Sequence, residues 1–340
     1  MPIENSIDYD AFTPRIAVVG VGGQGSNLVT RLFNSGIKSA DTIAMNTDLS
    51  HLNITRAHKK LLLGKEITNG LGAGGFPEVA AKCADASRTE IEKAIEGYDL
   101  VFVCAGMGGG TGTGAAPVVA RIAKEQGATI IGAVTYPFAL ERSRKLKAEW
   151  GIEQLIKESD TIITIENDKL LSYVPNLPIE KAFALVDNIV GNAVKGIADT
   201  ITLPSLINLD FADLRAVVKG TGTSVISIGN GSGSERVEQA IKTTRAHPLL
   251  TVDYEGAKGA LIHVVGGSNL TINDATRIGD GVTEDVAPDA NVIFGARMVP
   301  ELSDQIRVMS IITGVKAKFG SKSKEEAYSP MKMEMLEKIL

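Results

Sequence analysis

The chain has 340 residues, of which 44% are hydrophobic and 22% charged, and its formal net charge at pH 7 is −5. This composition is ordinary for a globular protein of about two domains, and the lack of a strongly basic block argues against nucleic acid as a main partner. The N-terminus is polar and acidic, and no apolar run approaches the roughly 20 residues of a membrane span, so we expect a cytoplasmic protein with no direct membrane insertion.

Strands alternate with helices along the first half of the chain. The predicted strands cover residues 15–19, 42–45, 99–104, 129–135 and 161–165, and the predicted helices cover the stretch after Gly25 up to Asn34, 77–96, 115–126 and 140–158. This alternation predicts right-handed βαβ units and an α/β fold with a mostly parallel sheet. Strands of such a sheet are buried on both faces, and these runs are predominantly apolar.

A long helix is predicted after this half. Apolar residues recur at helical spacing from Ile179 to Ile201, and Pro178 stands in the expected first turn. Such a helix is roughly 35 Å long, about the diameter of a domain. It therefore has the length to connect two ends of the molecule.

After Pro204 the pattern changes to a second, smaller α/β unit. Its predicted strands cover 224–230, 259–267, 291–298 and 305–315, with helices near 233–246 and 271–285. The predicted organisation is an N-terminal extension (1–14), a first α/β domain (15–175), a central helix (176–203), a C-terminal α/β domain (204–318) and a tail (319–340).

Three segments are rich in glycine: 20–25 (GVGGQG), 70–75 (GLGAGG) and 104–117 (CAGMGGGTGTGAAP). Glycine costs roughly 0.5–1 kcal/mol relative to alanine where the backbone is ordered, so these clusters need a physical reason. Flexible turns are one alternative, and close approach of backbone N–H groups to a polyanion at a helix N-terminus is the other. Because loops at the carboxyl ends of parallel strands share one edge of the sheet, we expect them to surround one phosphate-bearing ligand.

The class of this ligand depends on which motifs are present. GVGGQG fits the GxGxxG of a Rossmann dinucleotide-binding enzyme, but Asp41 begins the second strand instead of ending it. A dehydrogenase has no use for a second, richer phosphate loop, and no GxxxxGK[ST] motif is present. We expect a nucleoside triphosphate held by backbone amides, with Mg²⁺ to offset its charge; a Rossmann-type enzyme stays open as the alternative. No set of metal ligands is assigned.

The segment 108–114 (GGGTGTG) resembles the tubulin signature GGGTG[S/T]G, and residues 15–318 resemble the FtsZ branch of the tubulin superfamily. Supporting segments are GVGGQGSN (20–27), NTD (46–48), GLGAGG (70–75), END (166–168) and NLDFADLR (208–215). The resemblance implies a parallel-sheet GTPase domain of the tubulin/FtsZ type, a long central helix and a smaller α/β C-terminal domain. It also implies a self-assembling GTPase of the division ring at mid-cell, with membrane-tethering adaptor proteins as partners. The short tail favours an archaeal member.

The resemblance assigns GTP and GDP contacts residue by residue. The implied set is Gly22, Gly23, Gln24, Asn27, Asn46, Asp48, Gly72, Ala73, Gly74, Gly75, Gly106, Gly108, Gly109, Gly110, Thr111, Gly112, Thr113, Pro137, Glu141, Lys145, Asn167, Phe183 and Asp187. Glu141 matches a ribose contact, whereas Asn27, Phe183 and Asp187 match guanine contacts. A carboxylate accepts hydrogen bonds from both N1–H and N2–H of guanine, which adenine lacks. Without the resemblance, packing in the core is the alternative for Phe183.

One segment departs from the family pattern. The family commonly has PFxxEGxxR, whose arginine contacts the nucleotide, but here Arg142 replaces the glycine and Lys145 replaces the arginine. Lysine is a point charge without the planar fork of arginine. The cationic contact is therefore left open among Arg142, Arg144 and Lys145.

The predicted catalytic residues lie beyond the long helix. Asp210 and Asp213 share one face of a helical turn, and Asn208 precedes them. They resemble the FtsZ loop that polarises the attacking water at the nucleotide of the next subunit, so the resemblance implies head-to-tail filaments and hydrolysis that requires assembly. The alternatives are an ordinary capping turn, and a regulator that binds GTP but does not hydrolyse it.

Overall fold

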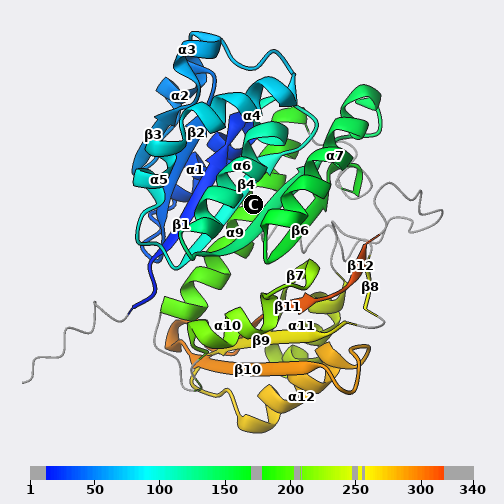
Figure 1. The fold of residues 1–340 in the computed structure, drawn as a ribbon. Coiled ribbons are helices and arrows are strands. Elements are labelled where there is room, and N and C mark those ends of the chain that lie inside the picture. Colours follow the sequence, from blue (N-terminus) through cyan, green and yellow to red (C-terminus); the bar gives the residue numbers. More distant parts are fainter. Residues whose placement is uncertain are drawn as a thin grey trace, which may run out of the picture.

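A computed structural model describes residues 13–169, 178–202, 207, 209–246, 252–254 and 257–317 of the chain. Within these residues ten strands form one sheet, in the order β10-β9-β11-β7-β6-β5-β4-β1-β2-β3 (Figure 1). The strands of the sheet are β1 (Ile16–Val21), β2 (Asp41–Asn46), β3 (Lys59–Leu62), β4 (Leu100–Gly106), β5 (Thr129–Tyr136), β6 (Thr161–Glu166), β7 (Gly222–Gly231), β9 (Gly259–Gly266), β10 (Asn291–Met298) and β11 (Ile306–Thr313). Two short strands, β8 (Val252–Asp253) and β12 (Lys316–Ala317), pair separately.

Helices connect these strands and cover both faces of the sheet. They are α1 (Gly22–Asn34), α2 (Leu49–Ile54), α3 (Lys65–Thr68), α4 (Pro77–Ala86), α5 (Arg88–Ile95), α6 (Thr111–Glu125), α7 (Arg142–Glu158), α9 (Ile179–Thr202), α10 (Phe211–Val218), α11 (Arg236–Arg245) and α12 (Ile272–Thr283). Among the described residues, no helix has both the length and the apolar character needed to cross a membrane.

The sheet is parallel from β3 through β7 and mixed beyond it. β6 and β7 pair in parallel over a short stretch, 161–163 with 222–224, whereas β11 runs antiparallel to both β7 and β9. The sheet is thus continuous from the first α/β unit into the second. The predicted α/β fold with a mostly parallel sheet is confirmed.

Burial on both faces explains why β1 and β4 have no polar side chain apart from a cysteine thiol. Val18 and Phe102 face a core shared with α1 and α9, whereas their neighbours Val19 and Val103 face a second core shared with α4, α6 and α7. This alternation is the two-residue period of a strand. Farther along the sheet, α11 and α12 cover β9 and β11 in a third core.

Helix α9 links the two halves of the molecule. It has 24 residues, which corresponds to about 36 Å. A Cβ placed on Gly191 would lie 3.4 Å from Leu32 on α1, and one on Gly196 would lie 2.9 Å from the Met309 sulfur on β11. Helix α9 thus lies against both halves, and Gly196 is the position where an added side chain would be too close to its neighbour.

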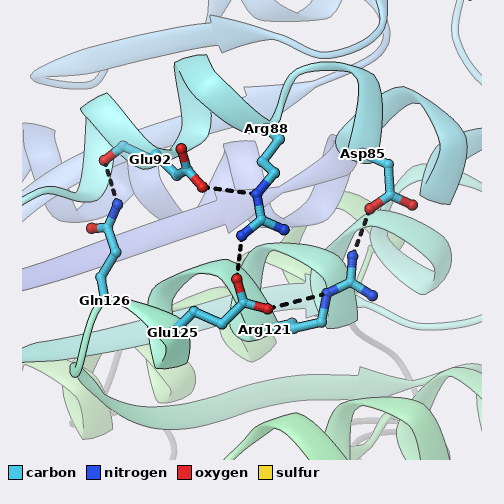
Figure 2. A network of polar contacts seen from close by, with 6 residues as sticks. All are labelled: Asp85, Arg88, Glu92, Arg121, Glu125 and Gln126. Carbon is cyan, nitrogen blue, oxygen red and sulfur yellow. Dashed lines mark hydrogen bonds and ion pairs between the residues drawn. The ribbon is translucent and has the colours of Figure 1, made fainter.

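A network of ion pairs joins α4, α5 and α6 on their outer surface (Figure 2). Arg88 pairs with Glu92 and with Glu125, and Arg121 lies 2.6 Å from Asp85 and 4.0 Å from Glu125. The two arginine side chains are 44% and 40% exposed, so each pair contributes little free energy. The network links the three helices but contributes little to the free energy of unfolding.

Several elements differ from the sequence predictions. The helix predicted over 77–96 is two helices that break at Ser87, whose hydroxyl accepts a hydrogen bond from the Gly64 N–H at 2.9 Å. Helix α6 begins at Thr111, four residues earlier than predicted. Its first turn contains Gly112 and Gly114, and these glycines reflect close backbone packing instead of a loop. The short elements α2, β3 and α3 were not predicted. The predicted tail, nearly all of the N-terminal extension and the first residues of the central helix lie outside the described residues.

Candidate functional site

A cavity of about 480 Å³ lies at the carboxyl ends of β1, β4, β5 and β6. Of the residues predicted to bind nucleotide, those that line it are Gly23, Gln24, Gly106, Gly109, Gly110, Thr111, Gly112, Pro137, Glu141, Asn167 and Phe183. Those that do not line it are Gly22, Asn27, Asn46, Asp48, Gly72, Ala73, Gly74, Gly75, Gly108, Thr113, Lys145 and Asp187. Four lining residues were missing from the prediction: Val21, Met107, Phe138 and Leu140. Arg144, one of the three candidates for the cationic contact, also lines the cavity.

The glycines after β4 have two different physical reasons. A Cβ on Gly112 would lie 2.5 Å from the Gly106 carbonyl oxygen, and one on Gly114 would lie 1.9 Å from the Pro77 carbonyl oxygen. These two positions need glycine because the backbone packs closely, and Gly114 serves the contact between α6 and α4. At Gly109 nothing described lies within 4 Å of such a Cβ, and this residue faces the cavity. Of these three glycines, only Gly109 therefore leaves room for a ligand in the cavity.

The N-termini of α1 and α6 meet at the cavity. Gly22 has a φ of +75°, and a Cβ there would lie 2.8 Å from the Gly112 nitrogen. Helix N-termini carry unpaired N–H groups and partial positive charge, which favour phosphate. Two long helices therefore direct these groups toward one small volume.

Thr113 is buried and its hydroxyl accepts a hydrogen bond from the Gly108 N–H at 2.8 Å. This hydroxyl therefore holds the glycine-rich turn in place. Thr111, in contrast, is half-buried and lines the cavity. Its Oγ1 lies 2.7 Å from the Thr47 Oγ1, which joins the end of β2 to the N-terminus of α6.

The segment 70–75 lies against the same helix end without lining the cavity. The Gly72 N–H donates to the Thr47 carbonyl at 3.0 Å, and a Cβ on Gly110 would lie 3.1 Å from the Gly75 nitrogen. Asp48 accepts a hydrogen bond from the His51 N–H at 3.0 Å and so caps α2. Asp48 and the glycine-rich segment 70–75 thus form one wall beside the glycine-rich turn that follows β4.

Two buried polar atoms at the cavity lack a partner among the described residues. They are the amide nitrogen of Gln24 and the amide oxygen of Asn167, and both side chains line the cavity. Leaving a buried polar atom unpaired costs about 1–3 kcal/mol, so such atoms normally have a partner in the functional state. One donor and one acceptor are what a nucleotide, with its phosphate oxygens and ribose hydroxyls, would pair with. The cavity therefore fits a nucleotide.

The far end of the cavity suits a base. Phe183 is 39% exposed, so it is not packed in the core, and its ring lies 5.6 Å from that of Phe138 in an edge-to-face arrangement. One helical turn further along α9, Asp187 is buried, and its Oδ2 lies 3.1 Å from the Arg31 Nε on α1. Burial raises the pKa of Asp187 to about 6, and Arg31 acts in the opposite direction. Sequence reasoning missed Arg31, although its position four residues after Asn27 places both on one face of α1.

The three candidate cationic side chains differ in whether they line the cavity. Arg144 lines the cavity and forms an ion pair with Glu141, whose other oxygen accepts from the Phe138 N–H at 3.1 Å. Lys145 lies 3.7 Å from Asp168 and does not line the cavity, and neither does Arg142. Arg144 is therefore the one of the three that is placed to meet a ligand.

The predicted catalytic acids lie far from this cavity. Asp210 is exposed and caps α10: its Oδ1 accepts from the Asp213 N–H at 2.8 Å, while the Asp210 N–H donates to the Asp213 Oδ2 at 3.1 Å. The capping turn weighed as an alternative is thus present. Helix α10 packs against β9 and β10, the two strands at one end of the sheet, and lies past the end of α9 (Figure 1). Asn208 lies outside the described residues.

The described residues contain no cluster of three or more histidine, cysteine, aspartate or glutamate side chains that could hold a metal ion.

Comparison with known proteins decides the family. The GTPase domain of the tubulin/FtsZ family matches residues 15–175, and the C-terminal domain of the FtsZ family matches residues 222–316. Cell division protein FtsZ 2 of Methanocaldococcus jannaschii is 54% identical over 306 residues, which cover 89% of this chain and 80% of that protein. The chain belongs to the tubulin/FtsZ family. This membership removes the Rossmann dinucleotide enzyme as an alternative.

Other FtsZ proteins support the same placement. Cell division protein FtsZ 2 of Halobacterium salinarum is 50% identical over 304 residues, which cover 89% of this chain and 77% of that protein. The structure of an empty FtsZ dimer from M. jannaschii superposes with a TM-score of 0.84 at 40% identity, and covers 96% of this chain and 100% of that one. The predicted resemblance to FtsZ is confirmed, and these relatives are archaeal.

Proposed function

We propose that this FtsZ-family chain binds GTP and GDP in the cavity and assembles head-to-tail into filaments of cell division. It hydrolyses GTP where the cavity of one copy meets Asp210 and Asp213 of the next. The observation that carries this proposal is the separation of the acids from the cavity by the length of α9 (Figure 1). A contact between two different faces of one molecule generates an open filament. Hydrolysis would then require assembly.

The proposed roles follow the placement of the residues. The N-termini of α1 and α6 hold the phosphates, Glu141 contacts the ribose, and Arg144 supplies the cationic contact. Phe183 stacks on guanine, and Asn27 and Asp187 read its edge. Mg²⁺, when bound with the nucleotide, offsets phosphate charge. Asp210, Asp213 and Asn208 of the neighbouring copy polarise the attacking water.

Exposed apolar side chains at both ends of the molecule support an assembly contact. Beside the cavity, Leu71, Phe76 and Leu140 are 85%, 59% and 79% exposed. Near the acids, Ile207 and Met298 are 42% and 46% exposed. Clustered apolar exposure of this kind commonly marks a protein–protein interface.

The cellular setting completes the proposal. We place the protein in the cytoplasm, in the division ring at mid-cell, where adaptor proteins tether the filament to the membrane. The retained pair of acids disfavours a regulator that binds GTP without hydrolysing it.

The proposed function is tested by measuring GTP hydrolysis per subunit against protein concentration, with pelleting of filaments in the same samples. We expect activity per subunit to rise with concentration in step with the pelleted fraction, because each complete site needs two copies. Constant activity per subunit without pelleting would mean that a single copy holds a complete site, and would contradict the proposal.

Arg31→Ala is expected to change how guanine binding depends on pH. Asp187 must be ionised to accept two N–H groups, so GDP affinity should be full above its pKa of about 6 and decline below it. Since Arg31 holds this pKa down, its removal should move the decline to higher pH. A rise of about one unit would leave about half of the Asp187 carboxyls ionised at pH 7 and weaken GDP binding there by roughly twofold.

The measurement is the dissociation constant of GDP from pH 5 to 8 for the wild type, Arg31→Ala and Arg31→Lys. The lysine variant keeps the charge, so its profile should stay nearer to that of the wild type. Titration of the GDP phosphates is common to all three proteins and cancels in the comparison. Identical profiles for all three would refute a role of Arg31 in holding Asp187 ionised.

A further inference from the structure

The imidazole of His51 faces the N-terminus of α1. Its Nε2 is the single described atom within 4.0 Å of where a Cβ on Gly23 would stand. Gly23 is exposed and lines the cavity proposed to hold phosphates. Because glycine occupies this position, the space between the imidazole and the first turn of α1 is open.

A neighbouring amide is placed to hydrogen-bond one nitrogen of the ring. The Nδ2 of Asn46 lies 3.5 Å from the His51 Nδ1. An amide N–H₂ is only a donor, so a ring that accepts this long contact at Nδ1 carries a proton on Nε2. The N–H group that remains therefore points toward the open space beside Gly23.

The backbone at His51 is held by the N-cap of α2. The His51 backbone N–H donates to Asp48 at the start of α2, and the side chain is half-buried. Asn46, which holds the ring, is itself buried at the end of β2. The next residue along, Thr47, contacts Thr111 at the N-terminus of α6. His51 is thus positioned by the same wall that borders the phosphate loop.

We propose that His51 is a phosphate-binding residue of this chain, and that its Nε2–H donates to a phosphate oxygen of the bound nucleotide beside Gly23. The inference rests on the proposed function, since it assumes that the cavity holds a guanine nucleotide. It adds a side-chain donor at the N-terminus of α1, where the phosphate contacts proposed above come from backbone N–H groups and the helix dipole. A hydrogen bond to an ionised phosphate is stronger than one between neutral groups.

The test compares His51→Ala, His51→Gln and the wild type by titration calorimetry of the full chain with guanosine, GMP, GDP and GTP. We expect His51→Ala to weaken GDP and GTP by about tenfold and to leave guanosine unchanged, because the lost donor meets a phosphate. His51→Gln offers an amide N–H at a similar distance along the side chain and should recover part of the loss. Asn53→Ala, an exposed position on the same short helix, is the matched control and should bind all four ligands like the wild type.

The possible results separate this inference from the proposed function. If His51→Ala binds all four ligands as the wild type does, the inference is wrong and the proposed function stands. If it weakens guanosine as much as GTP, His51 acts on the fold of the site and the inference is again wrong. If the wild type binds no guanine nucleotide, the proposed function fails and takes the inference with it.

Discussion

Asp210→Asn is expected to lower GTP turnover by a factor on the order of 100 or more, and to leave GTP binding and folding intact. The substitution removes the negative charge proposed to polarise the attacking water. Asparagine is as good an N-cap as aspartate, so its side-chain oxygen still accepts from the Asp213 N–H and α10 still begins at Phe211. The variant therefore separates a catalytic role from the capping role that the structure displays.

The measurements are GTP turnover in filaments, GTP affinity and the thermal midpoint of unfolding. Thr271→Asn is the matched control, because Thr271 caps α12 with the same capping-box pattern, and α12 lies away from the cavity. The control should turn over GTP like the wild type. Turnover by Asp210→Asn at the wild-type rate would leave Asp210 with a capping role alone and contradict the proposed mechanism.

Gly109→Asp is expected to weaken GTP binding by at least roughly a hundredfold while the fold persists. Nothing described lies within 4 Å of a Cβ at this position, so the new side chain has room. Its carboxylate would stand in the cavity beside the phosphates, and two like charges about 4 Å apart repel by about 4 kcal/mol at an effective dielectric constant of about 20. Repulsion alone should therefore empty the site.

Gly109→Asn is the control, since it has the same shape without the charge and should bind GTP far better than the aspartate variant. Affinities and thermal unfolding of both variants check the result. Equal loss in both variants would point to steric blocking, and normal binding by Gly109→Asp would mean that the phosphates do not pass this residue.

Mixing the two variants tests whether the site is shared between copies. Gly109→Asp keeps the acids but loses the nucleotide, whereas Asp210→Asn keeps the nucleotide but loses an acid. Neither should turn over GTP alone. In a mixed filament, some contacts place the nucleotide of an Asp210→Asn copy against the acids of a Gly109→Asp copy. Each such contact contains a complete site, so turnover should return to a fraction of the wild-type rate. A mixture as inactive as its components would contradict a site shared in trans.

The local sequence pattern determined most of the fold. Strand and helix periods placed every strand of the sheet except β3, and nearly every helix of eight residues or more. Failures came where the local signal was short or ambiguous. Helix α2 has six residues and was missed, although Asp48 is a readable N-cap, and the break at Ser87 depends on Gly64, which is 23 residues away.

The sequence also predicted the edge of the sheet at which the cavity lies, because glycine-rich turns at the carboxyl ends of parallel strands must share one edge of the sheet. The tertiary structure decided which residues reach it. Gly114 and Thr113 belong to the same glycine-rich segment as Gly109, yet packing assigns Gly114 to a helix contact and Thr113 to the turn itself. Composition cannot distinguish these roles, since each depends on what lies opposite.

For the same reason, local sequence patterns could not predict which polar side chains meet at the site. Arg31 meets Asp187 across 156 residues because α1 and α9 pack on one face of the sheet, and Arg144 faces the cavity because of its place on α7. Periodicity along the chain reports which face of an element is buried. It carries no information about which side chain of another element stands opposite, and that pairing arises only when the helices pack on the sheet.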